Sequence, residues 1–148
     1  MKKKIVIGVL IILFAVAVFF IANKYHNSKV AKENLNTINK ITEIVNKKND
    51  LNKLYVKDNN QEIEDEINEC DKLIDELHSI NGSGSIRNEY LVNIMNNSVE
   101  AVRNHKTALQ CSKNLDLKSY AEYNKKESDN IEQIKLEIQR FKISNGIE

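Results

Sequence analysis

The chain has 148 residues, with 22 lysine and arginine residues against 21 aspartate and glutamate residues, and it contains no proline or tryptophan. A chain of this length suits one folded domain beside a short apolar segment. Without the lysines at positions 2, 3 and 4, 19 of the 22 basic residues remain, so the chain lacks the surplus of positive charge needed to neutralise phosphates. We therefore expect no nucleic-acid partner.

Residues 5–22 form an apolar run, IVIGVLIILFAVAVFFIA, which carries no charged side chain and follows three lysines. Backbone amides in lipid need internal partners, so such a run is stable there as a helix. At 1.5 Å per residue it spans roughly 27 Å, close to the thickness of a bilayer's hydrocarbon core. The run predicts a transmembrane anchor. The alternative is a cleaved secretory signal, but a cut after Ala22 would place bulky Phe20 where a small residue is needed.

The positive charges predict how the anchor is oriented. The amino terminus and three lysines precede the run, whereas Lys24, Lys29 and Lys32, offset by Glu33, follow it. The end with more positive charge stays in the cytoplasm. We therefore expect a cytoplasmic stub over residues 1–4 and a single-pass protein of the cell membrane. Its C-terminal domain would be extracytoplasmic, and the lipid bilayer would be its first partner.

Small residues recur on one face of the predicted anchor. Gly8, Ala15 and Ala22 are seven residues apart, which places them on one side of a helix. Small residues allow transmembrane helices to approach closely, so this face predicts a homodimer. The alternative is that a lipid-facing helix carries a few small residues without pairing.

The chain after the anchor favours long helices. It has no proline, and no glycine between Gly8 and Gly82. Few β-branched residues alternate with polar ones, as a strand would require. Residues 23–57 are predicted to continue the anchor as one helix, with residues 23–36 as a stalk. Residues 37–145 are predicted to form a helical bundle.

Turn signals divide the bundle into helices. Residues 58–60 (DNN) cap a second helix, and residues 81–85 (NGSGS) end it and cap a third, which runs from 86 to about 113. A break at 114–116 leads to the last helix, which ends near 141–145. The predicted inner face of the third helix consists of Leu91, Ile94, Met95, Ser98, Ala101, Val102, His105, Ala108, Leu109 and Ser112. Four helices with short links predict an all-α, antiparallel, up-down and coiled-coil-like bundle.

One layer of the last helix is polar. Its two heptad rows are Leu117, Asn124, Ile131, Ile138 and Tyr120, Glu127, Ile134, Phe141. About a turn centred between residues 114 and 115, His105 lies level with Asn124, and Glu127 lies about 4.5 Å further along. His105, Asn124 and Glu127 are therefore predicted to form a buried polar layer. Such a layer either fixes the helix register at a cost in stability, or serves as a small-ligand or proton-sensing pocket, because histidine titrates near neutral pH.

The other potentially reactive residues lack the neighbouring groups that a metal site, a disulfide or a catalytic site needs. Asp75 lies three residues before His78, a spacing found in di-iron bundles, but a second copy is missing, so we expect no metal and no cofactor. A hairpin centred at residue 83.5 would place Cys70 and Cys111 roughly 21 Å apart along the axis, too far for a disulfide. The serines lack a nucleophile elbow or phosphate loop. We expect no catalytic residue and no enzymatic activity.

Two functions fit these predictions. The first is a non-enzymatic interaction or scaffolding protein of the bacterial cell envelope, with another envelope or membrane protein as its partner. The second is a ligand- or pH-sensing module. In the order and length of its elements, a basic stub and anchor leading into a four-helix bundle, the chain resembles the outer part of chemoreceptor-type sensors. That resemblance implies a second membrane span after the fourth helix, and the sequence ends at Glu148 without one. We therefore expect the first function.

Overall fold

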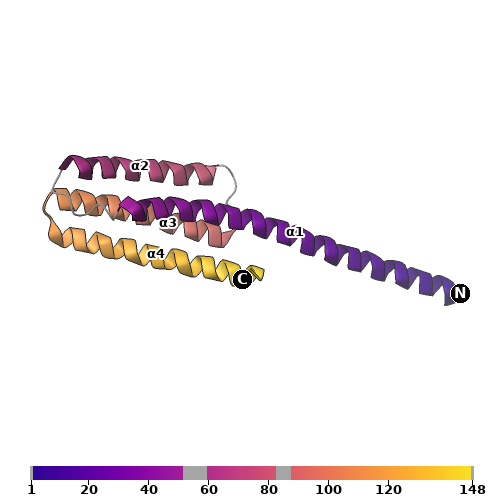
Figure 1. Cartoon of the computed structure of the whole chain (residues 1–148). Coiled ribbons are helices and arrows are strands. Elements are labelled where there is room, and N and C mark those ends of the chain that lie inside the picture. Colours follow the sequence, from indigo (N-terminus) through magenta and orange to yellow (C-terminus); the bar gives the residue numbers. More distant parts are fainter. Residues whose placement is uncertain (1, 52–59, 83–87, 148) are drawn as a thin grey trace. The chain divides into compact units, whose positions relative to one another are not determined.

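The computed structural model describes residues 2–51, 60–82 and 88–147, and it describes their side chains except those of residues 2–13, 15, 51, 81 and 82 (Figure 1). This part of the chain forms four helices, α1 (Lys2–Leu51), α2 (Asn60–Gly82), α3 (Glu89–Lys113) and α4 (Leu117–Asn145), and contains no strand. The predicted all-α fold with four helices is confirmed for these residues. The contacts divide the chain into two compact units, residues 1–33 and 34–148, and the predicted stalk crosses this division.

The first unit contains the N-terminal part of α1. Its described large apolar and aromatic side chains are 67–75% exposed: Phe14, Phe19, Phe20, Ile21 and Tyr25. Within the part of the chain whose side chains are described, no helix combines the length and the apolar character needed to cross a membrane. The predicted span covers residues 5–22, and its residues 5–13 and Ala15 lie outside the described side chains. The span therefore stays a prediction.

The second unit packs an apolar core between its helices. The core residues of α1 are Ile38, Ile41, Ile44 and Val45, and those of α2 are Ile67, Cys70, Leu73 and Leu77. Nine of the ten predicted inner-face residues of α3 are buried, and the tenth, Ser112, is half-buried. On α4, Ile134 and Phe141 are buried, but Leu117 is 73% exposed. The prediction of an apolar layer at Leu117 is wrong, because this residue opens the helix directly after the turn.

Ion pairs on the surface give the register of α2 against α3. Lys106 Nζ lies 2.6 Å from Asp71 Oδ1, and Lys113 pairs with Glu64. The two pairs are seven residues apart in opposite directions, so α2 and α3 are antiparallel neighbours, as Figure 1 also shows. The lysine pairs and the contact of Glu66 with His105 place Cys70 level with residues between about 101 and 107, whereas a hairpin centred at residue 83.5 predicted Asn97. The predicted register is wrong because α3 begins at Glu89, so the centre of the turn lies later in the chain than predicted.

The predicted separation of the two cysteines changes with this register. Cys111 lies about four to ten residues beyond the level of Cys70, or about 6–15 Å along the axis, which is less than the predicted distance of about 21 Å. Both cysteines are nevertheless free. Cys70 is fully buried and Cys111 is half-buried, so the two thiols differ in their exposure to solvent.

Two helices end in the same hydrogen-bond pattern with different residues. At the end of α4, Gly146 N–H donates to Ile143 O and Ile147 N–H to Lys142 O, with Gly146 in the left-handed region at φ 62°. At the end of α3, Leu115 N–H donates to Ser112 O and Asp116 N–H to Cys111 O, with Leu115 at φ 59°. Both are Schellman motifs, in which glycine is the usual left-handed residue. Leucine costs about 1–2 kcal/mol in this conformation because its Cβ approaches the following carbonyl.

Candidate functional site

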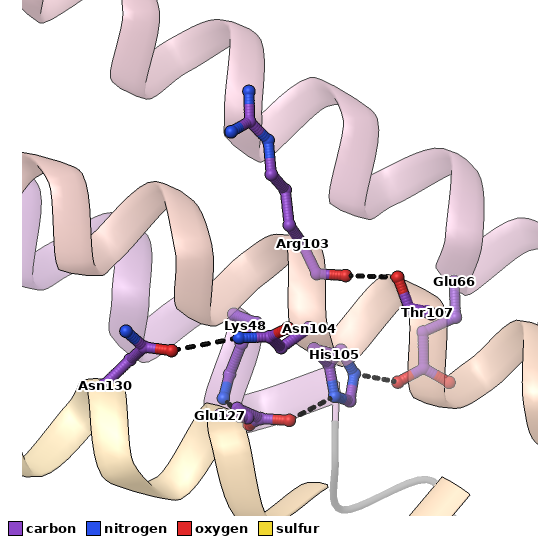
Figure 2. A network of polar contacts seen from close by, with 8 residues as sticks. All are labelled: Lys48, Glu66, Arg103, Asn104, His105, Thr107, Glu127 and Asn130. Carbon is purple, nitrogen blue, oxygen red and sulfur yellow. Dashed lines mark hydrogen bonds and ion pairs between the residues drawn. The ribbon is translucent and has the colours of Figure 1, made fainter. Parts of the chain in front are cut away.

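Each of the four helices contributes one side chain to a buried polar cluster, drawn in Figure 2. Lys48 of α1 is paired with Glu127 of α4. His105 of α3 lies between two carboxylates: its Nδ1 is 3.0 Å from Glu127 Oε2, and its Nε2 is 3.3 Å from Glu66 Oε1 on α2. We call these four residues the polar layer. It joins all four helices of the second unit through charged contacts.

Helical spacing places these side chains in the core. Lys48 lies three residues after Val45 and seven after Ile41, both buried. Residues three, four and seven apart share one face of a helix, so Lys48 continues an apolar row. His105 lies three residues after Val102 in the same way. The pattern that buries the apolar residues therefore also buries these polar ones.

The other two members follow the same rule on their own helices. Glu127 lies seven residues before buried Ile134, and Glu66 lies four residues before buried Cys70. The exposed fractions of the side chains are 0% for Lys48, 1% for His105, 7% for Glu127 and 10% for Glu66. Removing such charges from water costs several kcal/mol each unless partners replace the lost hydration. The side chains of this layer can therefore be buried only because they pair with one another.

The hydrogen bonds determine the charge of Glu127. Burial raises the pKa of its carboxyl, but hydrogen bonds from His105 and Lys48 together outweigh burial, and the pKa lies below its ordinary value of 4.5. Glu127 is consequently ionised at neutral pH. It supplies the negative charge opposite Lys48 and a hydrogen-bonding oxygen to His105.

Cys70 lies one turn from Glu66 and does not behave as a reactive thiol. Burial, followed by the negative charge of Glu66, raises the pKa of Cys70 to about 12. The thiolate is the nucleophilic form of cysteine, so this side chain is unreactive at neutral pH in the folded protein. Cys70 therefore packs as a small apolar residue.

A row of asparagines adjoins the polar layer on its α3–α4 side. Asn104 Nδ2 donates to Asn130 Oδ1 at 3.0 Å, and Asn130 Nδ2 donates to Asn97 Oδ1 at 3.0 Å. Figure 2 shows Asn130 reaching from α4 toward Asn104 on α3. All three side chains are half-buried. They extend the polar contacts of α3 with α4 beyond His105 and Glu127.

The structure brings together two of the three residues predicted for this layer. His105 and Glu127 are in contact, but Asn124 is half-buried and makes no side-chain hydrogen bond to the described residues. Asn124 lies outside this contact because His105 reaches Glu127, one turn further along α4. Lys48 and Glu66 were missed. The sequence does indicate that Lys48 lies on the buried face, because it continues the row of Ile41 and Val45.

The structure describes only part of the predicted dimer face of the anchor. The side chains at Gly8 and Ala15 lie outside the described residues, and Ala22 is exposed. This face stays a prediction.

The polar layer offers acid–base groups without a metal site. Within the described residues, no group of three or more histidine, cysteine, aspartate or glutamate side chains is arranged to hold a metal ion. The layer does contain two carboxylates on either side of one imidazole, so its hydrogen bonds depend on which of these groups carry protons. No family model, curated protein or solved structure significantly matches this sequence.

Proposed function

We propose that this chain is a membrane-anchored, non-enzymatic protein of the bacterial cell envelope, whose extracytoplasmic helical bundle binds or scaffolds another membrane or envelope protein. The observation that carries this proposal is the uncharged apolar run at residues 5–22 behind three lysines. Its described aromatic side chains, Phe14, Phe19 and Phe20, are 67–73% exposed. Contact with water would be unfavourable for so much apolar surface, and contact with lipid would be favourable.

Scaffolding has more support than ligand sensing. His105, the titratable residue on which a sensing pocket would depend, is 1% exposed and already bonded to protein groups. Leu115 and Leu117, at the turn between α3 and α4, are 84% and 73% exposed. Exposed apolar side chains of this size favour contact with another protein.

Anchoring is tested by placing a charge inside the run. Leu13→Arg adds a cost of about 2.5–3.5 kcal/mol near the middle of a span. We expect the full-length parent to stay with membranes after a carbonate wash and the variant to be released. Tyr25→Arg, beyond the end of the run, is the matched control and should stay with the membranes. Release of the parent by the wash would contradict anchoring.

Scaffolding is tested by cross-linking in native membranes. A photoreactive side chain at Leu115 should capture one partner protein reproducibly, identified by mass spectrometry. The same group at fully buried Leu77 is the control and should capture none. If the Leu115 derivative captures nothing while the chain remains in the membrane, the scaffolding role is wrong and the anchor is unaffected.

A further inference from the structure

Both ring nitrogens of His105 face carboxylate oxygens, Nδ1 that of Glu127 and Nε2 that of Glu66. An ionised carboxylate only accepts hydrogen bonds, and a neutral imidazole carries a hydrogen on one nitrogen alone. The row Glu127–His105–Glu66, which we call the line, can therefore form both hydrogen bonds only when it carries two protons. Either both ring nitrogens carry a proton, or one ring nitrogen and the carboxyl facing the other nitrogen do. With one proton fewer, a bare nitrogen faces a bare oxygen.

The charges of the layer point to the same number of protons. With both carboxylates ionised, Lys48 positive and His105 neutral, the four side chains carry one excess negative charge. A second proton on the line from Glu127 to Glu66 cancels that charge. An excess charge within a cluster of such low exposure is costly. Hydrogen bonding and charge are therefore satisfied in one and the same protonation state.

We propose that the polar layer is a proton-dependent latch, which holds α2 in the bundle while the line Glu127–His105–Glu66 carries two protons and releases α2 when one proton leaves. This latch concerns the second unit alone, so it does not rest on the proposed membrane anchor. It gives the bundle a way to respond to rising pH without any bound ligand.

The contacts of α2 explain why this helix would respond. Glu66 makes a partly buried polar contact of α2 with α3. The ion pairs Lys106–Asp71 and Lys113–Glu64 lie at the surface, where such pairs contribute little. Lys48, His105 and Glu127 retain their contacts among α1, α3 and α4 when Glu66 is repelled. Loss of one proton thus acts first on α2.

The groups facing His105 also set the acid limit of the latch. The His105 ring contacts Glu66 from α2 and Glu127 from α4, and these carboxylates in turn interact with Lys48 from α1 and with the Cys70 thiol from α2. Because the pKa of Glu127 is lowered in the folded state, its contribution to stability is present above its unfolded pKa. That contribution is lost as the pH falls through the folded value. The latch is therefore closed between this acid limit and the loss of the second proton.

The test is the pH dependence of unfolding for the full-length chain in detergent micelles. Urea unfolding, followed by the helical circular dichroism signal, is measured across about pH 5 to 8, where histidine titrates. The folded state keeps the extra proton that an unfolded histidine loses above about pH 6.5, so stability should fall as the pH rises beyond that value. The unfolding equilibrium constant should increase by up to about tenfold per pH unit, the limit for one proton.

Glu66→Gln separates the latch from general effects of pH. A glutamine amide both donates and accepts hydrogen bonds, so it satisfies a neutral imidazole. Above about pH 6.5, where an unfolded histidine is neutral as well, the pH dependence of this variant should be nearly flat. Glu64→Gln, which removes an exposed partner from the same helix, is the matched control and should keep the slope of the parent. A flat parent, a Glu66→Gln variant with the slope of the parent, or a Glu64→Gln variant that is also flat would overturn the proposal.

A direct count of protons decides the matter if Glu66→Gln fails to fold. Nitrogen-15 NMR of the His105 ring and carbon-13 NMR of the Glu66 carboxyl are recorded on the folded parent at neutral pH. Two protons, either both on the ring or one on the ring and one on Glu66, support the latch. A neutral ring beside an ionised Glu66 would contradict it.

Discussion

Two layers of the bundle, one apolar and one charged, are equally buried but are stabilised by different interactions. In one, Phe141 of α4 meets Tyr90 of α3 edge to face, with ring centroids 6.3 Å apart, and Phe141 is 0% exposed. In the other, Lys48 is also 0% exposed but is paired with Glu127. The first layer depends on volume and shape, since apolar contacts have no direction. The second depends on partners, since a charge without its partner is costly at such a site.

The largest difference between the two layers should appear with conservative substitutions. Glu127→Gln keeps the shape of the side chain but leaves Lys48 without its negative partner. We expect a loss of about 3–5 kcal/mol in the free energy of unfolding, the usual result of breaking a buried pair. Phe141→Leu, in the apolar layer, should cost about 1–1.5 kcal/mol. Urea unfolding at neutral pH measures both, and equal losses would mean that the polar layer is held by packing alone.

Replacing the whole polar layer should change the free energy of unfolding in the opposite direction. Lys48→Met, Glu66→Leu, His105→Leu and Glu127→Met together leave no unpaired charge. Buried ionic groups replaced by well-packed apolar residues are often neutral or stabilising by about 1–4 kcal/mol. We expect a thermal midpoint at or above that of the parent, and a strongly lowered midpoint would show that the layer is itself the main source of stability.

The smallest effect concerns the two Schellman motifs. Leu115→Gly should raise the free energy of unfolding by about 0.5–1 kcal/mol, because glycine adopts the left-handed conformation at φ 59° without strain. Gly146→Ala is the reverse change, and it should destabilise the protein by a similar amount, although an added Cβ has nothing within 4 Å. Thermal unfolding measures both. Two changes of the same sign would rule out backbone strain as the cause.

Sequence reasoning succeeded where the chain itself fixes the geometry. The turn between α3 and α4 is three residues long, so counting outward from it located His105 and Glu127 within one helical turn of each other. The same counting failed between α2 and α3, where the link is longer and the centre of the turn was placed too early in the chain. Lys48 was overlooked because a lysine in an apolar row ordinarily extends its stem along the core and keeps its charge in water. Its burial depends on Glu127, which is 79 residues away in the sequence.

The seven-residue spacing of the surface ion pairs has a consequence for folding. If α2 slipped by one heptad along α3, Lys106 would meet Glu64, so one of the two surface pairs would form again in the shifted arrangement. The same slip would move Glu66 away from His105 and toward Ser98, which carries no charge. The surface salt bridges therefore discriminate only weakly between the native register and the register shifted by one heptad. The buried charges raise the energy of the shifted register and so widen the gap that makes the native pairing unique.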